Sequence, residues 1–128
     1  MSVDEPPFLA KAREALKAAQ ILVQQDCFGS AANRAYYAAF HATRAALIAA
    51  NQSGPEDKWS HEAIQARLGI LTRSNKTYPS HLSSDLPRSR GIREMADYDT
   101  DMVNSKTAHR AVRTAEVFIM DVQKAILP

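Results

Sequence analysis

The sequence contains a single cysteine, Cys27, and no apolar run long enough to cross a membrane. One cysteine excludes an intrachain disulfide, and a membrane-spanning helix needs roughly 20 predominantly apolar residues in a row. Residues 1–7 contain two acids and two prolines and lack the apolar stretch of a signal peptide. These absences predict a cytoplasmic protein with no membrane association. We expect Cys27 to be a small buried hydrophobic residue.

Apolar residues make up 45% of the 128-residue chain, and much of this fraction is alanine. Alanine has the highest helix propensity and allows helices to pack at short distance, so a β-rich fold is disfavoured. A chain of this length can bury a core without metal or disulfide support. We therefore expect residues 1–128 to form a single helical domain.

Apolar residues recur at three- and four-residue steps in four segments, which is typical of amphipathic helices. The start and stop signals predict helices at about residues 7–26, 30–51, 60–75 and 105–127, with Ser30, Ser60 and Ser105 at the beginnings of the last three. A short helix is predicted at about 85–98, with Pro87 in its first turn. Each helix is apolar on one side, so the fold class is all-α, an antiparallel four-helix up-and-down bundle with an additional short helix.

Helical spacing divides the long second helix into two stripes. One stripe, which includes Tyr36 and Phe40, is interpreted as core. The adjacent stripe is polar and consists of Arg34, Tyr37, His41 and Arg44. A cation beside an imidazole can hold phosphate and move protons, but these side chains could equally be structural partners for acids near Asp97.

The charge of the chain changes sign abruptly at Arg93. Between Ser60 and Arg93 the chain has six basic residues against two acids, and the next twelve residues have four acids and no Lys or Arg. A basic segment of this kind, ending in Arg88, Arg90 and Arg93, can bind RNA or a nucleotide, although a solvated loop gives the same pattern. The four histidines show no paired ligand spacing, so we expect no metal and no cofactor.

Two separated motifs resemble the HEPN superfamily, in its branch of small stand-alone proteins. The first is the run from Asn33 to Leu47, which is similar to RAYYAxFHAxRAxL, and the second is the run from Arg93 to Asp99, which is similar to RxxADYD. The resemblance implies an antiparallel helical bundle that commonly forms a homodimer. It also implies a ribonuclease toxin of a toxin–antitoxin pair, with a minimal nucleotidyltransferase as the antitoxin partner.

The sequence departs from the family's ribonuclease signature, an arginine followed after four to six residues by a histidine on the late helix. The residue five places after Arg93 is Tyr98, and no histidine follows within six. Cleavage of RNA by its own 2′-hydroxyl needs a group that accepts the proton, a group that protonates the leaving oxygen, and a cation on the phosphate. Arg93 can be the cation, Asp97 a weak base, and His41, packed against Arg93 and Tyr98, the replacement for the missing histidine.

Tyr98 has a second possible role, because the related nucleotidyltransferases transfer AMP to a tyrosine of this late motif. An exposed Tyr98 suits such an acceptor, and the alternative is a buried tyrosine bonded to Arg34. The remaining candidates for binding RNA or a nucleotide are Arg34, Tyr37, Arg88 and Arg90. The chain is thus a metal-independent endoribonuclease toxin or a degenerate relative, and the alternative is a non-catalytic dimeric module that binds a nucleotide or a protein. A purely structural bundle is the last interpretation.

Overall fold

The computed structural model of the chain describes residues 5–54, 58–98 and 103–127. Within these residues it contains five α-helices and no strand, as the sequence predicts. The helices are α1 (Pro7–Gln24), α2 (Phe28–Ala49), α3 (His61–Ser74), α4 (His81–Tyr98) and α5 (Ser105–Ile126). Asp99 and Asp101, two of the acids after Arg93, lie outside the described residues.

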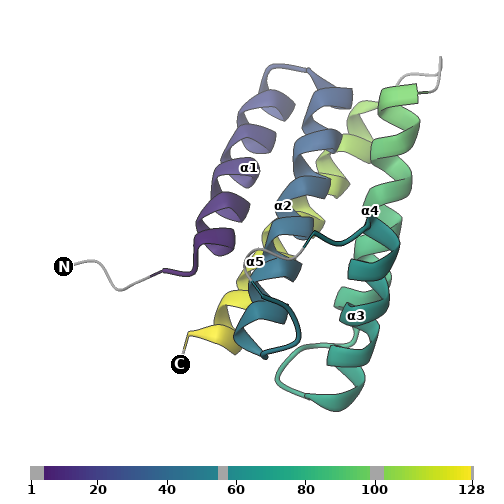
Figure 1. Cartoon of the computed structure of the whole chain (residues 1–128). Helices are drawn as coiled ribbons and strands as arrows, with labels where there is room; N and C mark the ends of the chain where they lie inside the picture. Colours follow the sequence, from purple (N-terminus) through teal and green to yellow (C-terminus); the bar gives the residue numbers. More distant parts are fainter. Residues whose placement is uncertain (1–4, 55–57, 99–102, 128) are drawn as a thin grey trace.

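Four long helices form the bundle, and α3 is the additional helix. Figure 1 shows that α1, α2, α4 and α5 alternate in direction, while α3 lies beside the first half of α4. The predicted fold class is therefore confirmed, but the short helix is α3, with 14 residues, whereas α4 has 18. No helix within the described ranges is long and apolar enough to cross a membrane.

Helix α2 is the centre of the fold and contacts all four other helices. Its small side chains allow these close contacts, because alanine leaves room for neighbouring backbones on several sides. The alanines of α2 that are buried are Ala31, Ala32, Ala35, Ala38, Ala39, Ala42, Ala45 and Ala46. The larger core side chains include Tyr36 and Leu47 of α2 itself and Leu9, Leu68 and Phe118 of the other helices.

The turn between α1 and α2 differs from the sequence-based expectation. Helix α2 begins at Phe28, so Ser30 lies inside the helix and the break falls at Asp26 and Cys27. Asp26 adopts a positive φ of 59°, a conformation in which Asp is tolerated better than most residues. Cys27 is exposed, so the expectation of a buried cysteine is wrong.

Helix α4 begins four residues before the expected start near Asp85, and Pro87 lies in its interior. Proline in a helix interior removes one backbone hydrogen bond. Leu82 and Leu86 are both fully buried, and this burial stabilises the turn in spite of the missing bond. Pro87 itself is exposed, with its ring on the solvent side of the helix.

The starts of α3 and α5 agree with the sequence to within one residue. Ser60 caps α3, because its hydroxyl accepts a hydrogen bond from the backbone N–H of Ala63 at 3.1 Å. Helix α5 is capped by Asn104, whose side-chain oxygen accepts from the N–H of Thr107 at 2.8 Å. The cap of α3 fixes the position of His61, the first residue of that helix.

Candidate active site between α2, α3 and α4

Arg93 is a buried cation on the side of α4 that faces α2. The residue is 8% exposed, and its guanidinium lies 5.5 Å from the ring centroid of Tyr36 and 5.7 Å from that of Tyr37. A third ring, that of Tyr98, lies 5.9 Å away. Aromatic faces attract a guanidinium and partly replace the water that the buried charge has lost. Arg93 also donates a hydrogen bond from Nη1 to Asp97 Oδ2 at 3.3 Å, one helical turn away.

Asn33 connects this pair to Arg34. The Asn33 side chain donates to Asp97 Oδ2 at 3.0 Å and accepts at Oδ1 from Arg34 Nε and Nη2 at 3.1 and 2.9 Å. The Arg34 guanidinium also lies 5.0 Å from the ring centroid of Tyr37. The expected link between Arg34 and Asp97 therefore exists, but it passes through Asn33, which was not among the predicted site residues.

A surface hollow of about 680 Å³ adjoins this network. It lies between the α1–α2 turn and the C-terminal part of α4, and Asn33, Arg34 and Asp97 form part of its wall. Among the described residues of its wall are one arginine, Arg34, and two carboxylates, Asp26 and Asp97. A ligand with a negatively charged group could enter here and contact Arg34 directly.

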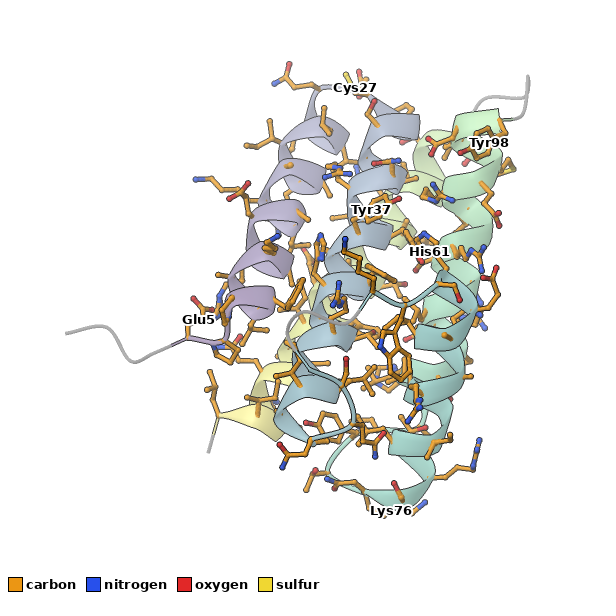
Figure 2. All side chains as sticks on the ribbon, viewed as in Figure 1. Glu5, Cys27, Tyr37, His61, Lys76 and Tyr98 are labelled. Carbon is orange, nitrogen blue, oxygen red and sulfur yellow. The ribbon has the colours of Figure 1, made fainter. Side chains whose placement is uncertain are left out.

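His61, the first residue of α3, is the histidine that packs against Tyr36. A hydrogen bond joins its Nδ1 to the hydroxyl of Tyr36, and its ring centroid lies 4.9 Å from that of Phe40. Figure 2 shows His61 and Tyr37 on the same face of the bundle. Burial lowers the pKa of His61, and the charges of Arg90 and Arg93 lower it further, so its imidazole is neutral at neutral pH. Burial raises the pKa of Tyr36 to about 12, so its hydroxyl keeps its proton.

Sequence analysis missed His61, and only one local signal pointed to it. Ser60 marks a helix start, which places the next residue at an end of α3 near the N-terminal amides. No periodicity in the sequence predicts which part of the bundle this helix end reaches. The approach of His61 to Tyr36 is a tertiary contact and becomes visible only in the fold.

His41 lies on the other side of α2 and faces α1. Its ring stacks with Phe8 at 6.0 Å between centroids, and it lines a small hollow together with Lys11 and Arg34. Burial, followed by the charges of Lys11 and Arg34, lowers its pKa to about 4. The structure thus packs His41 toward α1 and does not bring it to Arg93 and Tyr98, as the sequence analysis had expected.

The arginines of the predicted basic segment point in different directions. Arg90 donates from Nη2 to Glu62 Oε2 at 2.7 Å and so joins α4 to α3. This bond lowers the pKa of Glu62. Arg88 lies on the opposite flank of α4, where it faces α5. Arg88 therefore does not form one surface with Arg93, whereas Arg90 and Arg93 both lie close enough to Tyr36 and His61 for their charges to act on these side chains.

Tyr98 is 78% exposed at the end of α4 (Figure 2). The alternative of a buried tyrosine bonded to Arg34 is therefore wrong. The phenol lies beside the Arg93 guanidinium and is accessible to another protein.

Comparison with known proteins agrees with this layout. The family model described as "HEPN domain" matches residues 7–125, which include all five helices except the last residue of α5. The chain belongs to the HEPN domain family. This HEPN domain has its buried arginine on α4, as expected from the late motif, while the histidine nearest to that arginine's tyrosine cluster comes from α3.

Two relatives of this HEPN domain align along most of the chain. The protein named "Putative toxin MJ0605" of Methanocaldococcus jannaschii is 29% identical over 115 residues, which cover 90% of this chain and 83% of that protein. The "UPF0332 protein glr0978" of Gloeobacter violaceus is 26% identical over 119 residues, which cover 93% of this chain and 87% of that protein.

Proposed function

We propose that this HEPN domain is the toxin-type component of a toxin–antitoxin pair and that it cleaves RNA in an active site that contains Arg93. The family match and the relative that is named a toxin support the toxin-like part of the proposal. The single observation that carries the RNA-directed part is the buried Arg93, held over three tyrosine rings beside a hollow that contains a second arginine. A positioned arginine is well suited to a phosphodiester, because its planar guanidinium donates two parallel hydrogen bonds to phosphate oxygens.

The proposed reaction uses the 2′-hydroxyl of the RNA as the nucleophile. The 2′ oxygen forms a bond to phosphorus while the bond from phosphorus to the 5′ oxygen breaks, which leaves a 2′,3′-cyclic phosphate and a 5′-hydroxyl. His61 accepts the 2′ proton at Nε2 in the tautomer in which Nδ1–H donates to the Tyr36 hydroxyl. The protonated His61, or water, returns a proton to the 5′ oxygen, and Arg93 stabilises the charge that develops on the phosphate.

Asp97 and Asn33 orient the two arginines in this proposal. Asp97 accepts from both Arg93 and Asn33, and Asn33 accepts from Arg34, so the four side chains form one hydrogen-bonded row. Tyr37 lies between the two guanidinium groups. Arg34 and Tyr37 would then bind the RNA beside the scissile phosphate, the first through charge and the second through its ring.

The proposed antitoxin partner is a minimal nucleotidyltransferase that transfers AMP to Tyr98. The 78% exposure of Tyr98 supports this role, because the phenol oxygen must reach the active site of the other protein. The added phosphate would sit near Arg93, with which it could form an ion pair that competes with RNA.

Induced expression in a bacterial host tests the proposed function. We expect the wild-type chain to arrest growth, Arg93→Ala to relieve the arrest, and the matched control Arg73→Ala, an exposed arginine at the end of α3, to arrest growth like the wild type. All three proteins must be present at similar soluble levels. Normal growth with the wild type would contradict the proposal.

The alternative is a non-catalytic dimeric module that binds a nucleotide or a protein. The 8% exposure of Arg93 favours it, because little of the guanidinium is available to a phosphate in this conformation. This module would bind RNA or nucleotide with no chemical change, which the analysis of reaction products by mass spectrometry would show.

A further inference from the structure

A second basic surface lies on the other flank of α4. A groove of about 510 Å³ runs between α4 and α5, and it is lined by Arg88, Ser89, Ile92, Thr107, Arg110, Ala111, Arg113 and Thr114. Arg93 faces α2, whereas Arg88 and Ile92 face α5, so the groove and the candidate active site lie on opposite sides of one helix. Nothing in the proposed function uses this groove.

The three arginines of the groove are largely available to a ligand. No acidic residue among those that the structure describes lines the groove. The side chains of Arg88 and Arg113 are 70% and 74% exposed, and each forms an ion pair at 3.5 Å, with Asp85 and Glu116 on their own helices. Arg110 is exposed and forms no ion pair with any residue that the structure describes. Exposed pairs of this kind contribute little to stability, so the fold does not need this concentration of positive charge.

The floor of the groove is suited to a sugar and a base. Ile92 and Ala111 provide apolar surface, and the hydroxyls of Thr107 and Thr114 provide hydrogen-bond donors at the walls. Arginines above an apolar floor match a ligand that combines phosphates with flat, weakly polar groups. Nucleic acid has this chemistry, with phosphates that bind arginine and bases or riboses that pack on apolar surface.

The spacing of the cations along α5 favours a strand over a single nucleotide. Lys106, Arg110 and Arg113 follow each other at four- and three-residue steps, and therefore lie on one face of α5. At a rise of 1.5 Å per residue, this row is about 10 Å long. Such a row can contact successive phosphates, whereas a mononucleotide would use only part of it.

We propose that the α4–α5 groove binds the sugar–phosphate backbone of a single RNA strand through Arg88, Arg110 and Arg113. The inference deepens the proposed function and rests on it for the choice of RNA. The groove holds a segment of the substrate away from the scissile phosphate, and it contributes affinity without taking part in the chemistry. Because its contacts are to phosphates, they carry charge and no base specificity.

Binding to a strand that cannot be cleaved tests the groove separately from catalysis. The probe is a fluorescein-labelled 2′-O-methyl RNA of about 12 nucleotides, a length that covers a typical single-strand site. Fluorescence anisotropy at about 50 mM salt, where electrostatic binding is strong, gives the affinity. The variants are Arg110→Gln with Arg113→Gln, the same two positions changed to Lys, and a control with Lys17→Gln and Arg73→Gln, which removes equal charge from exposed positions of α1 and α3.

We expect the double Gln variant to bind about tenfold more weakly and to lose about 1.4 from the slope of log affinity against log salt, since each lost phosphate contact removes about 0.7. The double Lys variant and the control pair should stay within about threefold of the wild type, because they keep the groove charges. All variants change exposed residues, and thermal melts monitored by circular dichroism verify that each is folded.

Three results would overturn the inference: no binding by the wild type, wild-type affinity in the double Gln variant, or an equal loss in the control pair. Displacement of the labelled strand by AMP at the same concentration as the strand would also overturn the inference, because such competition would show a mononucleotide site. The two proposals fail in distinguishable ways. Wild-type protein that binds through the groove but neither cleaves RNA nor arrests growth contradicts the proposed function alone, and cleavage with unchanged binding in the double Gln variant contradicts the groove alone.

Discussion

At the scale of single residues, the buried guanidinium of Arg93 has the clearest physical consequences. A buried charge is unfavourable unless other groups replace its hydration, and here three tyrosine rings and the Asp97 carboxylate do so. Its Nε atom is buried with no hydrogen-bond partner among the described residues. A buried donor without a partner is costly, which makes it a position where a phosphate oxygen would be stabilising.

The pKa values of His41 and His61 should lie below the ordinary value of histidine and that of His81 above it, because their surroundings differ. Burial lowers the pKa of His41 to about 4, and burial together with Arg90 and Arg93 lowers the pKa of His61 below its ordinary value. The Asp85 carboxylate, followed by Asp121, raises the pKa of His81. A pH titration of the imidazole proton resonances, assigned with single His→Gln variants, measures all three. A pKa of His61 above 6.5 would contradict the packing described here.

The sequence predicted one contact of the site and misassigned another. Asp97 was predicted as a partner of the polar stripe of α2, and it is linked to Arg34 through Asn33. Arg93 was predicted to pack against His41, but it lies against Tyr36 and Tyr37. His61 and Asn33 were missed for different reasons. The contact of His61 with Tyr36 is a tertiary one, and Asn33 acts as a bridge between two charges whose separation no sequence pattern gives.

At the scale of elements, His81 links the first turn of α4 to α5 through hydrogen bonds. Its Nδ1 lies 2.7 Å from Asp85 Oδ2 and its Nε2 lies 2.7 Å from Asp121 Oδ2. A protonated imidazole donates from both nitrogens, so both bonds are strongest when His81 carries charge. This link holds α4 at the point where Pro87 weakens its backbone hydrogen bonding.

The link predicts a pH-dependent contribution to stability. The pKa of His81 is raised in the folded state, so its contribution is fully present below the unfolded value of about 6.5 and is lost as the pH rises through the folded pKa. His81→Gln should therefore reduce the unfolding free energy more at pH 5.5 than at pH 8.5. The difference should be on the order of 1 kcal/mol or less, because the side chain is 39% exposed.

Urea titrations of the wild type and His81→Gln at both pH values provide the measurement, and His109→Gln, an exposed histidine of α5, is the matched control. The comparison between variants is essential because His41 has the opposite effect. Its lowered pKa removes stability from the wild type as the pH falls below about 6.5. An equal effect of His81→Gln at both pH values would contradict the link.

Element boundaries were predictable where a side chain caps the helix and unpredictable where packing decides. Ser60 follows the capping rule, and the predicted start of α3 is correct. The start of α4 was placed too late, since proline favours a first turn, but the burial of Leu82 and Leu86 extends the helix toward its N-terminus. Tertiary burial therefore outweighed the local preference of Pro87.

At the scale of the whole molecule, the bundle leaves one face of α4 without a partner helix. Gly91, Met95 and Tyr98 are exposed at four- and three-residue steps, and Met95 and Tyr98 are among the large exposed hydrophobic residues of the described chain. A dimer that covers this face would bury these two apolar side chains. This arrangement is the proposed homodimer.

Analytical ultracentrifugation tests the dimer. We expect the wild type to sediment with twice the 14.1 kDa mass of the chain and Met95→Glu to shift the equilibrium toward the monomer, because a charge is costly at a buried interface. Met120→Glu, which changes another exposed methionine, on α5, should leave the dimer intact. A monomeric wild type, or equal dissociation by both variants, would contradict the placement of the interface on α4.

The fold as a whole followed from periodicity and composition, while the function of its surfaces did not. Alanine content and apolar spacing predicted the bundle, because both are local properties of the chain. The separation of Arg88 from Arg90 and Arg93 depends on how α4 packs against α5, α3 and α2, and the order of basic residues along the chain does not predict it.

The measurement that tests the central claim most directly is cleavage of a labelled RNA by the purified protein in the presence of a chelator. We predict products that end in a 2′,3′-cyclic phosphate. The cleavage rate should fall by about 100-fold or more in Arg93→Ala, and by about 100-fold or more in His61→Gln. Tyr36→Phe should retain more activity than His61→Gln, because it removes only the orienting hydroxyl. Cleavage by Arg93→Ala at the wild-type rate, or no cleavage by the wild type, would contradict the account.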